Sequence, residues 1–192
     1  KTVDEYHQHL NSFINQSEFE RLNNPVWHIH GGNPPDSDLA IPFSMLLNLV
    51  SASGANNKEA LWGFIDKYIE NISPSTNPGL DKAVGYAICY FKDFVEPNKV
   101  FRAPDELETK ALRDLSVALQ KCHKNSTPEE LQKVVYAVGV SHGFDPLRKW
   151  FKAIYEVLLG ESQGPRFGGF IALYGIEKTV SLIENALNSS LT

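Results

Sequence analysis

The sequence predicts an all-α protein, a single domain of about eight or nine helices packed as a bundle or cage. Apolar residues recur at intervals of three and four along most of the 192-residue chain, and this spacing places them on one face of a helix. Prolines and glycines divide these stretches into short loops. No stretch is convincingly patterned as a strand, and no fixed-period repeat of the solenoid kind is present.

The stretches with helical spacing are bounded by residues that begin or end helices. They lie at 4–22, 43–50, 57–71 and about 79–96, after Pro104, after Thr127, from Asp145 to Gly160, from Pro165 to Gly175, and across 180–187. Thr127-Pro128-Glu129-Glu130 has the pattern of a capping box, and either Ser37 or Asp38 is placed to cap the helix of 43–50. Three prolines and two glycines break residues 23–39, where Val26–Ile29 favour an extended path.

Composition is that of an ordinary globular protein, with 42% apolar and 21% charged residues. No apolar run approaches a membrane span, and no signal peptide pattern opens the chain. Cys89 and Cys122 lie far apart on apolar helical faces, so we expect reduced core cysteines and a cytoplasmic protein. The net charge of −5 argues against a general polyanion binder. Because residues 1–75 carry four Lys/Arg against nine Asp/Glu, a nucleic-acid contact would need a local basic patch in the later two thirds.

One stretch of this later part, Leu147–Gly175, joins two apolar helices through a glycine-rich, partly basic corner. Gly160 is placed to end the first helix. Pro165 can begin the second, which leaves Arg166 in its first turn beside unpaired N–H groups that suit an anion such as phosphate. The alternative is a tight corner whose glycines only permit close packing.

Aromatic residues beside cations give a second hint of nucleic-acid binding. Phe101 precedes Arg102, and Trp150 lies between Lys149 and Lys152. Such pairs can stack an unpaired base and hold its phosphate. Trp150 also fits the apolar stripe of its helix and could be plain core, and the lysines could be no more than a solvated face.

Catalytic and metal sites have little support. The pairs His7/His9 and His28/His30 suggest zinc, but alternate residues share a face only on an extended segment, and a third ligand is not apparent. We therefore predict no metal. Ser141 and its neighbours form no hydrolase motif, and the chain has neither a Walker A loop nor a strand-linked glycine motif. We predict no catalytic site and no cofactor in this chain.

Blocks of sequence along nearly the whole chain resemble class I lysyl-tRNA synthetase. They are Pro25–His30 with the Gly-Asn-Pro-Pro that follows, Phe43–Val50, Leu61–Ile65, Phe101–Glu106, Tyr155–Gly160, Gly164–Gly168 and Phe170–Gly175. Gly169 departs from the family, which has serine there, and this could alter a hydrogen bond at the corner.

The resemblance implies that residues 1–192 are the family's C-terminal helical anticodon-binding domain. A catalytic Rossmann domain with HIGH and KMSKS signatures is expected upstream and is absent from this chain; His28-Ile29-His30-Gly31 is no displaced HIGH motif. The parent protein would be an ATP-dependent lysine–tRNA ligase. The implied partners are the anticodon stem-loop of tRNA(Lys) and the upstream catalytic domain, with no membrane.

Residue chemistry then suggests which side chains would splay the anticodon, stack its bases and read their edges. The tRNA-binding candidates are Arg166, Phe167, Lys149, Lys152, Phe101, Arg102, Trp27, His28 and His30. Two alternatives stay open. The chain could be a helical protein-interaction module whose acidic first third meets a partner, or a small metal-dependent enzyme that uses the His pairs.

Overall fold

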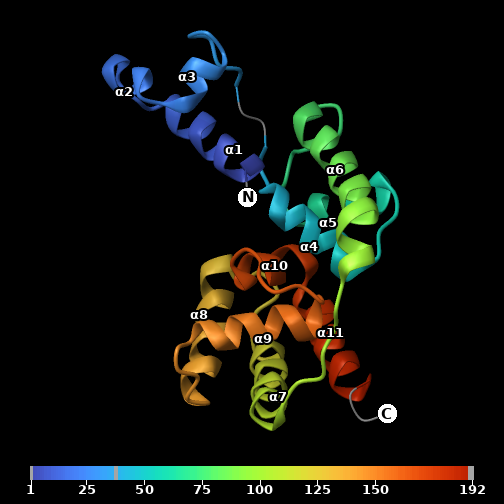
Figure 1. Ribbon diagram of the computed structural model, residues 1–192. Coiled ribbons are helices and arrows are strands. Elements are labelled where there is room, and N and C mark those ends of the chain that lie inside the picture. Colours follow the sequence, from blue (N-terminus) through green and yellow to red (C-terminus); the bar gives the residue numbers. More distant parts are fainter. Residues whose placement is uncertain (1, 37–38, 190–192) are drawn as a thin grey trace.

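The computed structural model describes residues 2–36 and 39–189, and every regular element in these ranges is helical (Figure 1). The predicted all-α class is therefore confirmed. The elements are α1 (Thr2–Phe13), α2 (Glu18–Leu22), α3 (Pro25–Ile29), α4 (Phe43–Ser53), α5 (Lys58–Tyr68), α6 (Pro78–Tyr90), the π-helix η1 (Phe91–Val95), the 3-10 helix η2 (Glu96–Asn98), α7 (Glu106–Gln120), α8 (Pro128–Ser141), α9 (Arg148–Leu158), α10 (Phe167–Tyr174) and α11 (Ile176–Ser189). The described ranges hold eleven α-helices, more than the eight or nine expected.

The additional helices lie near the N-terminus. The helix expected over 4–22 ends at Phe13, and a capping box between Ser17 and Glu20 begins a separate one. The expectation of an extended Val26–Ile29 is wrong, because this segment forms α3. The Asn24 side chain accepts a hydrogen bond from the N–H of Val26 at 3.1 Å, and Pro25 occupies the first turn, as in many helix starts. The caps predicted at Ser37 and Asp38 lie outside the described residues.

Helices α1–α3 form an arm that projects from one end of the molecule, α4–α6 lie in the middle, and α7–α11 form the other end (Figure 1). The short helix α10 is central, because it packs on α4, α5, α8 and α11. The largest side chains with less than 2% exposure come from α4, α5, α6, α7, α8, α9 and α10, and they join the middle and the far end into one core.

The arm contributes directly to α4. The N-cap residue of α4 is Pro42, which has no side-chain group to accept a hydrogen bond. The Asp4 carboxylate of α1 accepts instead from the N–H groups of Phe43 at 2.5 Å and Ser44 at 3.1 Å. A negative charge at a helix N-terminus is favourable, so α1 and α4 are joined by a cap that comes from far away in sequence.

Gly168 allows α8 and α10 to pack closely together. A Cβ at this position would overlap the carbonyl oxygen of Pro128 and lie 2.5 Å from the nitrogen of Gln132, both backbone atoms of α8. The neighbouring Gly169 is different: its Cβ would meet only the flexible end of Met45, at 3.0 Å. The close-packing interpretation of the corner glycines is therefore correct for Gly168, whereas a serine at 169 would fit after a small movement of Met45.

Both cysteines are free. Cys122 is half-buried, but Cys89 is exposed, so the expectation of a core position is wrong for Cys89. None of the helices within 2–36 and 39–189 is long and apolar enough to cross a membrane.

Candidate nucleic-acid interface

The outer face of α9 and the loop before α10 enclose a cleft of about 730 Å³. Its lining carries four cationic side chains and, in the described part of the chain, no aspartate or glutamate. The four are Arg148, Lys149, Lys152 and Arg166. Although the whole chain has a net charge of −5, the charges that line this cleft favour the binding of an anionic ligand.

The cleft is basic because the two faces of α9 differ. Trp150 is fully buried and its indole N–H donates to the carbonyl of Val135 at 2.9 Å, so Trp150 is a core residue. Lys149 and Lys152 lie on the exposed face. The Lys149 ammonium donates to the carbonyl of Asp145 at 2.7 Å, and that of Lys152 lies 3.4 Å from Glu156. The helix begins at Arg148, later than the Asp145-Pro146 start that we expected.

The opposite wall of the cleft is the corner between α9 and α10. Gly160 follows α9 with a φ of 68°, the left-handed conformation predicted for it. Tyr155 from α9 donates its hydroxyl hydrogen to the carbonyl of Pro165, and its ring occupies the space that a Cβ at Gly164 would need. Burial raises the pKa of Tyr155 well above its usual value, so this hydroxyl stays a donor and fixes the corner.

Arg166 is exposed at this corner. It is the N-cap residue of α10 and not, as expected, part of the first turn. The N–H of Gly168 in that turn donates to the side chain of Gln132 at 2.8 Å, so this donor is already used. Phosphate binding by free helix N–H groups is therefore not supported. Arg166 itself has no ion pair to any residue in 2–36 or 39–189, so no described carboxylate competes with a phosphate for its guanidinium.

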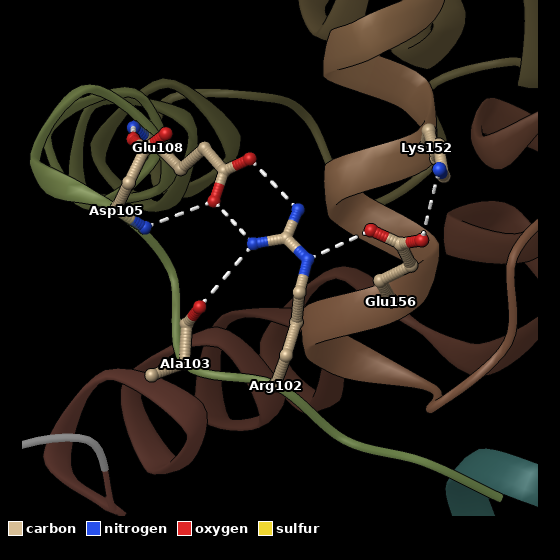
Figure 2. Close-up of polar contacts among 6 residues, drawn as sticks. All are labelled: Arg102, Ala103, Asp105, Glu108, Lys152 and Glu156. Atoms are coloured by element: carbon tan, nitrogen blue, oxygen red, sulfur yellow. Dashed lines mark hydrogen bonds and ion pairs between the residues drawn. The ribbon is translucent and has the colours of Figure 1, made fainter.

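Arg102 is held by carboxylates instead of being free for phosphate. Figure 2 shows its guanidinium between Glu108 of α7 and Glu156 of α9. It donates to the two oxygens of Glu108 at 2.6 and 2.8 Å, to Glu156 at 2.7 Å and to the carbonyl of Ala103 at 3.2 Å. These bonds use four of the five guanidinium donors, and the bond from Arg102 holds the pKa of Glu108 below its usual range. Arg102 therefore ties the segment between η2 and α7 to both α7 and α9.

The two phenylalanines among the candidates differ in accessibility. Phe101 is 58% exposed; its ring lies against Gly160 and 5.1 Å from the Lys99 ammonium. Phe167 is only 1% exposed and packs edge-on against Tyr155 with ring centroids 5.8 Å apart. Phe101 can therefore present a ring to a base, while Phe167 is out of reach in the core.

The remaining candidates lie on the arm, far from the cleft (Figure 1). Trp27 is half-buried and stacks on Phe13 with centroids 6.2 Å apart. His28 bonds the carbonyl of Leu22 at 2.8 Å, and His30 bonds the Tyr6 hydroxyl at 2.8 Å. The two histidines thus have separate partners, and within the described ranges no group of three or more His, Cys, Asp and Glu is placed to hold a metal.

A second cleft, of about 620 Å³, adjoins the first and was missed from the sequence. It shares Ser162 and Gln163 with the basic cleft. Its lining includes the aromatic residues Tyr90 and Phe94 and the acidic residue Glu161. A signal was present, because two aromatic residues four apart lie off the apolar stripe of the helix expected at 79–96.

Comparison with known proteins gives these clefts a context. No family model matches the chain. Individual lysine–tRNA ligases are similar to it in sequence. The one from Roseobacter denitrificans is 56% identical over 191 residues, 100% of this chain. Those from Rickettsia felis and Rickettsia conorii are 40% and 39% identical over 189 residues, 97% of this chain. The chain is homologous to part of the lysine–tRNA ligases. It spans 36% of the length of each of these relatives.

The homology to lysine–tRNA ligases confirms the resemblance to lysyl-tRNA synthetases, whereas the assignment to class I stays a prediction. With the Roseobacter protein the homology covers this chain in full, and so includes α9, the corner and α10, which build the basic cleft. The sequence blocks around this corner were also the densest part of the resemblance to lysyl-tRNA synthetase.

Proposed function

We propose that the chain is the C-terminal anticodon-binding domain of a class I lysine–tRNA ligase. It would hold the anticodon stem-loop of tRNA(Lys) while an upstream catalytic domain, which uses ATP, aminoacylates the tRNA in the cytoplasm. We assign no catalytic site and no cofactor to this chain. The observation that carries the proposal is the four-cation cleft, found in an acidic chain that is homologous along its length to lysine–tRNA ligases.

The binding mechanism follows from the chemistry of the cleft. Arg166, Lys149 and Lys152 would contact phosphates, which sets the position of the RNA and makes the affinity depend on salt. Unpaired anticodon bases would leave their stack and lie on exposed aromatic rings, such as that of Phe101. Arg102 would hold the segment between η2 and α7 in place. Trp27, His28 and His30 remain candidates for a separate contact of the arm with RNA.

Titration of fluorescently labelled tRNA(Lys) with the 192-residue chain tests the proposal, with an anticodon-altered tRNA as the competitor. We expect tighter binding of the natural tRNA. Arg166→Ala should weaken binding and lower the slope of log K against log salt by about one. The matched control is Arg113→Ala on α7, an exposed arginine outside the cleft, which should bind as the unaltered chain does.

Equal affinity for both tRNAs would exclude anticodon recognition by this chain. No binding at low salt would exclude RNA binding and favour the alternative, a helical protein-interaction module. That alternative has one feature of its own: the arm exposes Phe19 by 77% and Ile29 by 64% within the acidic first third.

A further inference from the structure

The second cleft has an exposed aromatic wall, which is formed by Tyr90 and Phe94. Tyr90 ends α6 and Phe94 lies in η1. They are 46% and 61% exposed, and their rings lie 5.1 Å apart with planes inclined by 37°. The ring of Phe43 supports Tyr90 from the side, at 6.3 Å. Two large rings that are held in place and open to solvent each offer an apolar face on which a planar ligand can stack.

The lining of this cleft also includes Glu161, whose carboxylate has one oxygen without a donor among the residues that the structure describes. This oxygen is buried. An unsatisfied buried acceptor is costly and calls for a function. The Ser51 hydroxyl hydrogen-bonds to this carboxylate, and Lys99, whose charge also acts on it, donates to the carbonyl of Ser51 at 3.2 Å. A ligand that fits the cleft would therefore combine a flat ring with an N–H donor at its edge.

Continuity with the basic cleft identifies the class of ligand. The two clefts share Ser162 and Gln163, so an RNA chain with phosphates on Lys152 and Arg166 can continue into the second cleft. Aromatic platforms beside a cationic groove are typical of sites for single-stranded nucleic acid. The uncharged rings alone would suit many ligands, but together with the adjoining cations they favour RNA.

We propose that the cleft between Tyr90, Phe94 and Glu161 binds one unpaired nucleobase, which stacks on the two rings and donates an edge N–H to the Glu161 carboxylate. This inference rests on the proposed function and extends it, because it names the subsite in which a base is read. A uracil satisfies both requirements, since it has a π-face for stacking and a single ring N–H at its pairing edge. A base methylated at this nitrogen would retain the stacking and lose the hydrogen bond.

Photochemical cross-linking locates the base directly. The probe is a tRNA(Lys) anticodon stem-loop with 5-iodouridine at one loop position at a time, irradiated with the 192-residue chain and analysed by mass spectrometry. We expect a cross-link to Tyr90 or Phe94 from one loop position. Cross-links only to other residues would overturn the inference even when the RNA binds tightly.

Affinity measurements with substituted chains provide the second readout. The double variant Tyr90→Leu/Phe94→Leu keeps apolar side chains against Phe43 and should bind about five- to 150-fold more weakly, with an unchanged salt slope. The matched control Tyr136→Leu on α8, where the ring is 54% exposed and outside both clefts, should bind normally. Unchanged affinity of the double variant overturns the base subsite alone. If the unaltered chain binds no RNA, the proposed function fails as well.

Discussion

Replacing Arg102 by methionine should destabilise the fold and leave the salt dependence of RNA binding by the folded variant unchanged. The substitution keeps an apolar stem of similar length and removes the guanidinium that bridges Glu108 and Glu156 (Figure 2). Glu108 then loses both of its bonds from Arg102 and keeps its capping-box bonds with Asp105. Since the Glu108 side chain is only 10% exposed, its charge would be left largely desolvated.

The size of the effect follows from this burial. Removing one partner of a fully buried ion pair costs about 3–5 kcal/mol, whereas an exposed pair contributes about 0–1 kcal/mol. The Arg102 side chain is 37% exposed and that of Glu156 is 22% exposed, so the network lies between these limits. We expect a loss of about 2–3 kcal/mol, which for a chain of this length lowers Tm by about 4–12 °C.

Urea unfolding followed by circular dichroism measures this loss, and the tRNA titration is repeated at a temperature where the variant is folded. Arg113→Met on the exposed face of α7 is the control and should change stability little. In a double-mutant cycle, Glu108→Gln should recover part of the loss because it removes the unpaired charge. Full stability together with lost RNA binding would refute our interpretation and would indicate that Arg102 contacts a phosphate.

Two further substitutions test the packing of the corner and the buried carboxylate. Gly168→Ala should lower the free energy of unfolding by about 1–3 kcal/mol, because the backbone atoms of α8 that its Cβ would meet cannot rotate away. Gly169→Ala should leave this free energy unchanged or raise it by up to about 1 kcal/mol. Equal losses of stability for the two variants in thermal unfolding would disprove the distinction. Burial raises the pKa of Glu161, so its protonated form favours the fold and this contribution is lost as pH rises through the raised pKa. Glu161→Gln should therefore raise the free energy of unfolding by about 1 kcal/mol at pH 7 and by progressively less at acidic pH. An increase that does not depend on pH in urea titrations would show that the charge of Glu161 is not its cause.

The long helices could be predicted from the sequence because their signals are local. Apolar spacing gives the core face, and the capping box predicted at Thr127 is present in the structure. The structure adds a second capping box, between Asp105 and Glu108, that was not predicted. The short helix α3 was missed because β-branched and aromatic residues lower helix propensity. Tertiary burial of Val26 overrides that preference, although Asn24-Pro25 was a local start signal that could have been used.

The site was less predictable, because accessibility and partners depend on residues far away in sequence. The sequence shows that Arg102 is a cation, but its partner Glu156 is 54 residues further along. Phe167 looks like a ring beside a cation, yet the packing of α10 places it in the core. Exposed aromatic residues such as Phe94 become visible as a surface only when their helix is placed beside the corner.

The cap that Asp4 provides to α4 limits how this protein can be divided or recombined. Pro34 and Pro35 lie between the arm and the bundle, and such a proline-rich stretch would ordinarily be chosen as a module boundary. Yet a bundle cut there would leave the N–H groups of Phe43 and Ser44 without their acceptor. The arm thus supplies the cap of α4, and any segment exchanged for it would have to bring a carboxylate to the same point in space.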